Sequence, residues 1–466
     1  MFDLLIVGGG VSALSLLYEL PEEMHVLVLQ NDQPASSMLA QGGIATSLFE
    51  AGIDQHVEDT FQAGCHQGDI DVIRDMITTG NAVLQDYMEA GIPFDRKDGR
   101  YELALEAAHS VPRILHMKDR TGQSLCQWLG QRIRPEVTML TGDLLEVLHE
   151  DGHIIGAVFQ TAAGTFQFDG DQVVLATGGA SGLYPVSTNR SERSAIPLIL
   201  AREAGCRLVD MAYFQFHPTL LDSGPKNELV SEAVRGAGGQ LVNQTGERIM
   251  EGIELAPRDV VARAIYARQL QGEKVYLDIS RIAHFSERFP AIRRCLDSYG
   301  LTHLIPVTPG AHYMIGGIEA DTAGRTAVSG LFAIGEASCT GFHGSNRLAS
   351  NSLLEGLAMG RKCAAVIRAS RGTLSQLSAS TISFPAFRHK AQLMDYCGIY
   401  REEEKLKEGL RYFSQAAQGP ERLYQALCLE IIQAALKAPS SGVHYIIDKE
   451  GKDESIISRR ENQDVS

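Results

Sequence analysis

The sequence lacks the cysteine pairs and the long apolar runs that mark two large classes of protein. Its eight cysteines are scattered over 466 residues, and none forms a C-x-x-C pair. Zinc and iron–sulfur sites usually draw thiolates from such pairs, so we expect no metal site. No apolar run reaches the roughly 18 residues of a membrane span, and no signal-peptide pattern precedes the first strand. We therefore expect free thiols in a reducing cytoplasm, away from the membrane.

Positive charge is also scarce. The chain has 42 lysines and arginines against 57 aspartates and glutamates, which gives a formal net charge of −15. Nucleic acids and acidic membrane surfaces attract basic proteins, so neither is expected as a partner. The hydrophobic fraction of 44% is ordinary for a globular protein, and the length allows two or three domains.

The chain does contain a βαβ pattern near its start. Residues 4–7 are apolar and predict a buried strand, residues 12–20 predict a helix, and residues 25–29 predict the next parallel strand. Gly8, Gly10 and Ala13 lie between the first strand and the helix in the spacing G-x-G-x-x-A. This spacing in this context predicts a dinucleotide site, because the glycines let the backbone approach a pyrophosphate at a helix N-terminus. Gln30 stands where an acidic residue usually binds a ribose hydroxyl, and its amide can serve there.

Two further apolar strands end in polar or glycine-rich turns. The strand that begins near residue 172 runs into Thr177-Gly178-Gly179, and the strand within residues 330–336 runs into Glu336. We expect these strands to share one sheet with the first, so that their carboxyl ends face one ligand. A second glycine loop, with Ser37, Gln41, Gly42 and Gly43, follows soon after the first. A flavin, buried along its length, needs such a loop more than a nicotinamide cofactor does.

The chain divides into segments of different composition. Prolines, histidines and arginines become frequent over residues 211–313, where the alternation of strands and glycines stops. We interpret this stretch as an inserted domain that interrupts a dinucleotide-binding domain made of residues 1–210 and 314–372. Residues 373–466 are charged and helical in pattern, which predicts a C-terminal helical domain. The stretch from residue 448 onward is polar, and we expect it to fray.

Six segments together identify a resemblance. They are, in order, AQGGIA, LATGGASGLY, FQFHPTLL, LAPRDVVARAI, GAHYMIGGI and GFHGSNRLASNSLLE. The combination resembles the succinate dehydrogenase/fumarate reductase flavoprotein family, and within it the members that oxidise L-aspartate. The resemblance implies an α/β fold: a Rossmann-like FAD-binding domain with an inserted α+β capping domain and a C-terminal helical domain. It also implies non-covalent FAD, because Ser36 stands where membrane-associated relatives have the histidine that bonds the flavin.

The resemblance adds residues to the cofactor site that the glycine motifs predict. It places Glu336 at an adenosine ribose hydroxyl of FAD, and it places Asn351, Ser352 and Leu353 at a helix start beside the isoalloxazine. A helix N-terminus there would stabilise negative charge on a reduced flavin. The complete predicted set is Gly8, Gly10, Ala13, Gln30, Ser37, Gln41, Gly42, Gly43, Thr177, Gly178, Gly179, Glu336, Asn351, Ser352 and Leu353.

The substrate site is also implied by resemblance. Arg347 would hold a substrate carboxylate, because a planar guanidinium matches a carboxylate bidentately. Gln215, His217, Ser231 and His312 would bind the carboxylates of the same four-carbon substrate. From the residues alone, each histidine could instead be structural, and Arg347 could be a surface arginine with an unrelated ion pair.

Four residues are implied to carry the chemistry. Arg258 would face the reacting carbon and transfer a proton, with Glu232 and Arg235 as its relay. Glu106 would lie near the substrate amino group. The residues alone leave two alternatives open: Arg258 could pair with Asp259 or Glu254 at the start of its helix, and Glu106 could be a solvated loop residue.

The activity implied is FAD-dependent oxidation of L-aspartate to iminoaspartate, the first step of NAD biosynthesis, with dioxygen or fumarate as electron acceptor. An unstable imine product implies possible handover to quinolinate synthase. One alternative is a flavoprotein of the fumarate reductase or succinate dehydrogenase type. Another is a degenerate flavin-binding homologue without turnover, because Ala195-Ile196-Pro197 stands where the family has Gly-Asp-Gly.

Overall fold

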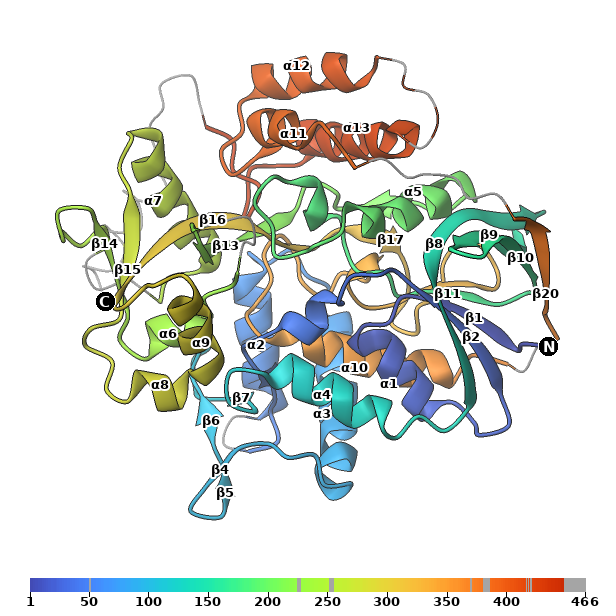
Figure 1. Ribbon diagram of the computed structural model, residues 1–466, viewed down its shortest axis with the longest axis horizontal. Helices are drawn as coiled ribbons and strands as arrows, with labels where there is room; N and C mark the ends of the chain where they lie inside the picture. Colours follow the sequence, from blue (N-terminus) through green and yellow to red (C-terminus); the bar gives the residue numbers. More distant parts are fainter. Residues whose placement is uncertain are drawn as a thin grey trace.

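A computed structural model describes residues 1–447 except 50–51, 224–227, 251–254, 369–370, 380–385, 416, 418 and 420. Its largest sheet has eight strands in the order β18-β11-β1-β2-β8-β9-β10-β20 (Figure 1). The bounds are β1 Leu4–Val7, β2 His25–Gln30, β8 Glu136–Glu150, β9 His153–Thr161, β10 Gly164–Asp169, β11 Val173–Leu175, β18 Leu331–Ala333 and β20 Thr373–Ser378. The first five strands in this order pair in parallel and the last three continue antiparallel.

The predicted parallel strands are confirmed, and they are neighbours. Leu5 of β1 pairs with Val173 of β11, and Val173 pairs with Leu331 of β18, although these residues lie far apart in the chain. Every residue of these three strands is buried. A parallel strand covered on both faces reads as a continuous apolar run, which explains why its sequence shows no alternation.

Helices α1 (Val11–Glu19), α3 (Ile70–Glu89), α4 (Thr121–Gly130) and α10 (Asn351–Ala364) lie together beside this sheet (Figure 1). Glycines allow their close contacts. A Cβ on Gly360 would lie 2.6 Å from the side chain of Ser15 on α1, and a Cβ on Gly80 of α3 would lie 2.3 Å from the side chain of Leu354 on α10. Gly356 of α10 lies beside Ser12 of α1 in the same way, so the two helices run in the same direction and their N-termini face the same region.

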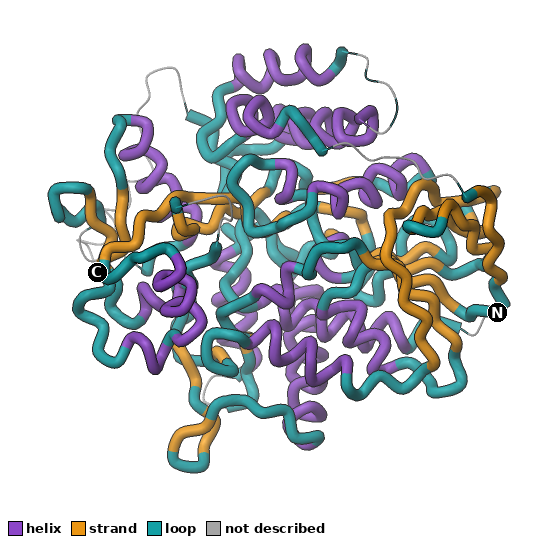
Figure 2. The backbone as a smooth tube through the Cα atoms, in the orientation of Figure 1, coloured by secondary structure: helices purple, strands orange, loops and turns teal. Residues whose placement is uncertain are grey.

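A second sheet has four antiparallel strands in the order β13-β16-β15-β14. The bounds are β13 Phe214–Leu221, β14 Gln240–Asn243, β15 Val275–Asp278 and β16 Leu304–Met314, with helices α6 Glu232–Gly236, α7 Arg258–Leu270, α8 Phe285–Arg288 and α9 Pro290–Ser298. These elements have their own apolar core, with Leu241, Val261, Leu277 and Ile305 fully buried. Figure 2 shows the strands of the two sheets at opposite ends of the molecule with helices between them.

Helices α11 (Lys390–Cys397), α12 (Glu403–Phe413) and α13 (Glu421–Lys437) form a layer over α5 (Ile196–Glu203) (Figure 1). The hydroxyl of Tyr184 donates to the carbonyl of Cys397 at 3.0 Å, which ties this layer to the main core. The segment predicted to be helical from residue 373 begins with a strand instead: β20 pairs with β10 because its residues 373–378 continue the edge of the large sheet. The stretch from residue 448 that we expected to fray lies outside the described residues.

The remaining elements are one helix of 11 residues and several short strands and turns. They are α2 Ile53–Ala63, β3 Ile44–Ala45, β4 Arg96–Lys97, β5 Arg100–Tyr101, β6 Leu103–Ala104, β7 Ile114–Leu115, β12 Leu208–Val209, β17 Gly317–Glu319, β19 Ser338–Cys339 and the 3₁₀ turns Ser36–Leu39, Ser181–Leu183, Glu192–Ala195 and Gly335–Ala337. Among the described residues, no helix is long and apolar enough to cross a membrane.

Candidate active site

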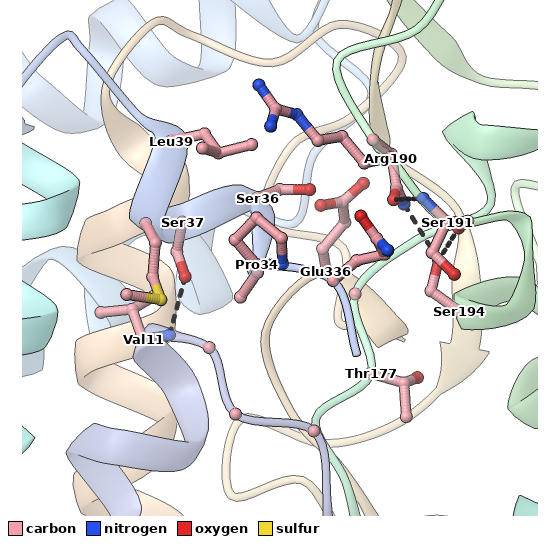
Figure 3. Close-up of a pocket in the computed structure, with 18 of the residues that line it drawn as sticks. Val11, Pro34, Ser36, Ser37, Leu39, Thr177, Arg190, Ser191, Ser194 and Glu336 are labelled. Carbon is pink, nitrogen blue, oxygen red and sulfur yellow. Dashed lines mark hydrogen bonds between the residues drawn. The ribbon is translucent and has the colours of Figure 1, made fainter. Parts of the chain in front are cut away.

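A cavity of about 640 Å³ lies at the carboxyl ends of the parallel strands. The glycine turn after β1 forms part of its wall, and the backbone N–H of Val11 donates to the hydroxyl of Ser37 at 3.0 Å (Figure 3). Gly8 has φ +117, and a Cβ there would lie 2.1 Å from the carbonyl oxygen of Ala176, so only glycine fits. Gly178 has φ +75 with nothing within 4 Å of its Cβ position, so its open side faces the cavity that it lines.

Most of the predicted cofactor residues line this cavity. They are Gly8, Gly10, Gln30, Ser37, Gln41, Thr177, Gly178, Glu336, Ser352 and Leu353. The buried Thr177 hydroxyl has no hydrogen-bond partner among the described residues, although it lies in the cavity wall. Two helix N-termini, a glycine turn and an unpaired hydroxyl around a cavity of this size fit a dinucleotide such as FAD.

Five predicted cofactor residues lie behind the wall. They are Ala13, Gly42, Gly43, Gly179 and Asn351. Ala13 is fully buried inside α1, and Gly43 is packed so closely that a Cβ would meet the side chain of Ile114 at 2.3 Å. The Asn351 amide is already used, because its oxygen bonds His56 Nε2 at 2.9 Å and its nitrogen donates to Thr60 at 3.0 Å. These residues shape the cavity through packing.

The loop of residues 188–194 forms the opposite wall, and sequence reasoning missed it. Asn189 donates through its amide to the carbonyl of Gly179 at 3.2 Å and to the hydroxyl of Ser194 at 3.0 Å. Figure 3 shows Arg190, Ser191 and Ser194 facing the cavity from this side. The signal in the sequence was a polar run directly before the apolar helix α5, which by itself marks only a loop.

Glu336 projects between the two walls (Figure 3). Its carboxylate accepts the backbone N–H of Met314 at 2.9 Å. Burial raises the pKa of Glu336 to about 7. A carboxyl group with this pKa can accept or donate a hydrogen bond near neutral pH, which suits recognition of a hydroxyl.

At one end the cavity reaches Arg347 and His312, and beyond them lies a cluster of charged groups. Arg347 Nη2 and Arg258 Nη1 both donate to the Gln215 Oε1 atom, each at 3.1 Å. The Gln215 amide nitrogen donates to Asn346 Oδ1 at 2.9 Å and to the Arg347 carbonyl at 2.8 Å, which fixes the amide orientation. Glu232 pairs with Arg258, but no ion pair to the buried Arg347 is found among the described residues, so this end of the site is suited to an anion.

Arg347 lies in the glycine- and serine-rich loop before α10. Its Nη1 also donates to the hydroxyl of Ser352 in the first turn of that helix. Burial, with the nearby Arg258, lowers the pKa of Arg347 to about 10, so the side chain stays charged at neutral pH. Small neighbouring residues leave room for a guanidinium that is only 4% exposed, which explains why the chain places an arginine in this loop.

Glu232 lies between two arginines at the start of α6. Its Oε2 accepts Arg258 Nε at 2.6 Å and lies 3.6 Å from Arg235 Nη2, while Oε1 accepts the backbone N–H of Ala107 at 2.9 Å. Burial alone would raise the pKa of Glu232, but the two arginines outweigh it and lower the pKa to about 2. Glu232 is therefore ionised at any physiological pH and holds Arg258 in place.

Glu106 is a second buried carboxyl group in the cluster. Its Oε2 accepts the hydroxyl of Ser350 at 2.6 Å, and a Cβ on Gly42 would lie 3.1 Å from its Oε1. Burial and then the charge of Glu232 raise the pKa of Glu106. Ser350 adopts a left-handed backbone with φ +62, which is uncommon for a residue other than glycine and is typical of functional loops. The alternative that Glu106 is a solvated loop residue is wrong, because the residue is only 4% exposed.

Two histidines complete the cluster. The rings of His217 and His312 lie 5.2 Å apart. His217 Nδ1 accepts the backbone N–H of Thr219 at 3.2 Å, which leaves its proton on Nε2, and His312 Nδ1 bonds the Thr188 hydroxyl at 3.0 Å. Burial and the nearby arginines lower the pKa of both rings well below the ordinary value. Both are therefore neutral at pH 7 and can donate a hydrogen bond without adding charge.

The β13–β16 ladder explains how two histidines reach one site. Gln215 pairs with Tyr313 and Phe216 pairs with Ala311, so His312 is an extra residue in a bulge. A bulge re-aims a side chain, and bulges are frequent next to active sites. No local pattern in the sequence announces this bulge.

Ser231 has a structural contact that the sequence did not suggest. Its hydroxyl accepts the backbone N–H of Ala233 and caps α6, while its own N–H donates to the Gln41 side chain at 3.2 Å. Gln41 therefore links the loop beside the cavity to the start of α6. The described residues contain no cluster of histidine, cysteine, aspartate and glutamate that could hold a metal ion.

Comparison with known proteins shows where this arrangement recurs. Residues 3–353 match the FAD binding domain family. The chain is 39% identical over 488 residues to the L-aspartate oxidase of Agrobacterium fabrum, with 98% of this chain and 92% of the relative covered. It is 37% identical over 453 residues to the L-aspartate oxidase of Pyrococcus horikoshii, with 94% of each covered.

Solved structures confirm the predicted fold. A quinol fumarate reductase of E. coli superposes with a TM-score of 0.83 at 25% identity, covering 96% of this chain and 91% of that one. An Sdh1 complex of Mycobacterium smegmatis gives a TM-score of 0.76 at 27% identity, covering 96% and 88%. The identities and coverage of the curated relatives decide the family: the chain belongs to the L-aspartate oxidases, FAD-binding flavoproteins with the fold of succinate dehydrogenase and fumarate reductase.

Proposed function

We propose that this protein oxidises L-aspartate to iminoaspartate with FAD as its cofactor, as the first step of NAD biosynthesis. The observation that carries the proposal is the convergence of Arg258 and Arg347 on a single neutral oxygen of Gln215, next to the buried carboxyl group of Glu106. Two cations select a dicarboxylate, and a nearby carboxyl group selects one that carries an ammonium. Family membership supports the same substrate.

Binding of the carboxylates is assigned to five side chains. Arg347 presents a planar fork to one carboxylate, and a charge-assisted pair of hydrogen bonds of this kind is both strong and directional. His217 and His312 are both neutral, so they donate hydrogen bonds to the same substrate without adding positive charge to the site. Gln215 and the Ser231 hydroxyl complete the set, since each has a polar group already held in place by the protein.

Glu106 is assigned to the substrate ammonium. The α-nitrogen must lose a proton as the carbon–nitrogen double bond forms, and a carboxyl group whose pKa is raised can take that proton. The pairing also turns the α-hydrogen in a defined direction. Succinate and fumarate lack the ammonium, so Glu106 is the residue that distinguishes aspartate from them.

Arg258 is assigned to charge stabilisation when aspartate is oxidised, and to proton transfer to the reacting carbon when fumarate is the electron acceptor. Its Nε donates to the ionised Glu232, and its Nη1 reaches Gln215. Arginine is a weak acid in water, so proton transfer requires the buried Glu232 and Arg235 as a relay. The 3.6 Å separation of Arg235 from Glu232 supports this path.

The flavin, when bound, supplies the acceptor for the hydride that leaves the α-carbon. We propose that Gly8, Gly10, Gln30, Ser37, Gln41, Thr177, Gly178, Glu336, Ser352 and Leu353 hold it, because they line the cavity. Dioxygen or fumarate would then take the electrons. Iminoaspartate hydrolyses in water, which favours handover to quinolinate synthase in the cytoplasm.

Anaerobic bleaching of the flavin tests the proposal. The purified yellow protein should lose its flavin absorbance on addition of L-aspartate, and it should not do so with D-aspartate. Bleaching by succinate instead of L-aspartate would favour a reaction of the succinate dehydrogenase type. This alternative is considered because the similar solved structures are a fumarate reductase and an Sdh1 complex. A yellow protein that no dicarboxylate bleaches would be a flavin-binding homologue without turnover.

A further inference from the structure

We propose that Tyr313 is a positioning residue that holds the guanidinium plane of Arg347 in the orientation that meets a carboxylate. The Cζ atom of Arg347 lies 4.4 Å above the centre of the Tyr313 ring. The inference rests on the proposed role of Arg347 in substrate binding. It assigns a function to a side chain that no step of the proposed reaction uses.

The contacts of Arg347 leave one direction to be fixed by the ring. Its Nε and Nη2 donate to Gln215 and its Nη1 donates to Ser352, so both edges of the fork are occupied. Hydrogen bonds along the edges limit movement within the plane, but they leave the group free to tilt. An aromatic face against the guanidinium limits that tilt, because the flat cation and the negative face of the ring attract each other best when stacked.

The Tyr313 ring is itself held from its far end. Its hydroxyl donates to Glu355 Oε2 at 2.6 Å, and His343 Nε2 lies 3.1 Å from the same oxygen and 3.2 Å from the tyrosine hydroxyl. Glu355 and His343 are only 2% and 5% exposed, so this polar triangle is sealed from solvent. These three contacts hold the far end of the ring, although the buried Nδ1 of His343 has no hydrogen-bond partner among the described residues.

The fold couples this anchor to the site. Glu355 lies on α10, the helix whose first turn carries Ser352, and Ser352 bonds Arg347 directly. Tyr313 pairs with Gln215 across the β13–β16 ladder, and Gln215 also bonds Arg347. One helix and one ladder therefore supply both the edge contacts and the face contact of the same guanidinium.

Electrostatics gives a reason for an aromatic residue at this position. Arg258 repels Arg347, and both share the oxygen of Gln215. A leucine would fill the space but would offer no attraction to a buried cation. The tyrosine face offsets part of the repulsion without using either edge of Arg347, so that a carboxylate can take the place of the Gln215 oxygen there.

Binding of succinate, followed by the change in flavin absorbance, tests the inference without turnover. Tyr313→Leu removes the aromatic face, and Tyr313→Phe keeps the face while removing the bond to Glu355. We expect the Kd of the leucine variant to rise about tenfold, the equivalent of ~1.4 kcal/mol. We expect the phenylalanine variant to bind within about threefold of the native protein, even if its Tm falls. A Kd unchanged by Tyr313→Leu would overturn the inference.

A second cycle separates positioning from general packing. Arg347→Lys weakens succinate binding in the native background, and it should weaken it much less in the Tyr313→Leu background, because lysine does not depend on the stacked plane. Equal losses in both backgrounds would make Tyr313 merely structural. If Tyr313→Leu fails to retain flavin, Tyr313→Met replaces it. If both variants fail, Tyr313→Phe decides. A tenfold higher Kd for succinate in Tyr313→Phe would mean that the hydroxyl of Tyr313, and not its aromatic face, supports binding, and it would overturn the inference.

The outcome is separable from that of the proposed function. Native protein that binds succinate but is not bleached by L-aspartate would contradict aspartate oxidation and leave the test of Tyr313 intact. Native protein that is bleached by aspartate while Tyr313→Leu binds succinate normally would contradict only the role of Tyr313.

Discussion

Removing the charge of Glu232 is the perturbation whose effect the structure defines best. The pKa of Glu232 is about 2, against an ordinary value of 4.5, because Arg258 and Arg235 outweigh its burial. This difference corresponds to roughly 3 kcal/mol in favour of the ionised form. In the variant Glu232→Gln, the amide keeps the size of the side chain, but two buried arginines lose their anion. We expect a loss of about 3 kcal/mol in the free energy of unfolding at pH 7, within the range for breaking a buried pair.

The pH dependence gives the prediction its sign. A carboxyl group with a lowered pKa in the folded state stabilises the protein above its unfolded pKa, and the contribution is lost as pH falls toward the folded pKa. The advantage of the native protein over Glu232→Gln should therefore be constant from about pH 5.5 upward. Below pH 4.5 it should shrink. Glu106 provides partial compensation, since removing the neighbouring charge eases its ionisation beside Arg258.

Urea denaturation at several pH values measures the effect. The matched control is Glu319→Gln, which removes a carboxylate paired with Arg207 at 3.0 Å on an exposed part of the surface. Surface pairs contribute about 0–1 kcal/mol, so the control should change little. A loss at Glu232 no larger than that of the control, or one that grows as the pH falls, would refute the electrostatic reasoning.

Three further predictions concern the site directly. Glu106→Gln should lower kcat/KM for L-aspartate, with an increase in activation free energy of about 2–5 kcal/mol, the cost of losing one partner of a desolvated charge pair. Fumarate reduction by the same preparation should be spared. Equal losses in both activities would point to a structural role. Arg347→Lys should cost roughly 1.5–3 kcal/mol in kcat/KM, since a bond to a charged group is lost with the fork, and near-normal steady-state rates would place Arg347 outside the site. Acid precipitation should release all the yellow colour into the supernatant, because Ser36 cannot bond the flavin covalently; colour in the pellet would contradict this.

Local patterns in the sequence predicted much of the fold. The first strand, helix and second strand were located from residues 4–29 because continuous apolar runs and a glycine turn are local features. The helix starts expected at Asn351 and Arg258 match the first residues of α10 and α7. The domain boundaries at residues 210, 313 and 372 remain predictions, and β20 shows why the last is hard to predict: a strand that completes a distant edge has no local mark.

The candidate site was predicted less evenly. Its charged residues came from linked motifs, and the structure brings Arg258, Arg347, Gln215, Glu232 and Glu106 into one buried cluster. The prediction assigned Asn351 to the cofactor, whereas its amide is taken by His56 and Thr60. Both histidines face the same cluster because of a bulge at His312, which no periodicity signals.

The sequence by itself determined the types of chemistry available to this protein. Glycine spacing after a strand defines a turn that a phosphate can approach, and an arginine among small residues defines a cation with access to a ligand. Tertiary structure decided which of these groups meet. Glu232 takes a pKa of about 2 only because Arg258, from another helix, and Arg235, three residues along its own helix, flank it in the buried interior. Tyr313 stacks on Arg347 only because the pairing of β13 with β16 and the helix α10 hold both residues in place. Contacts between distant segments depend on the packing of the whole chain, and so does the electrostatic character of each group they bring together.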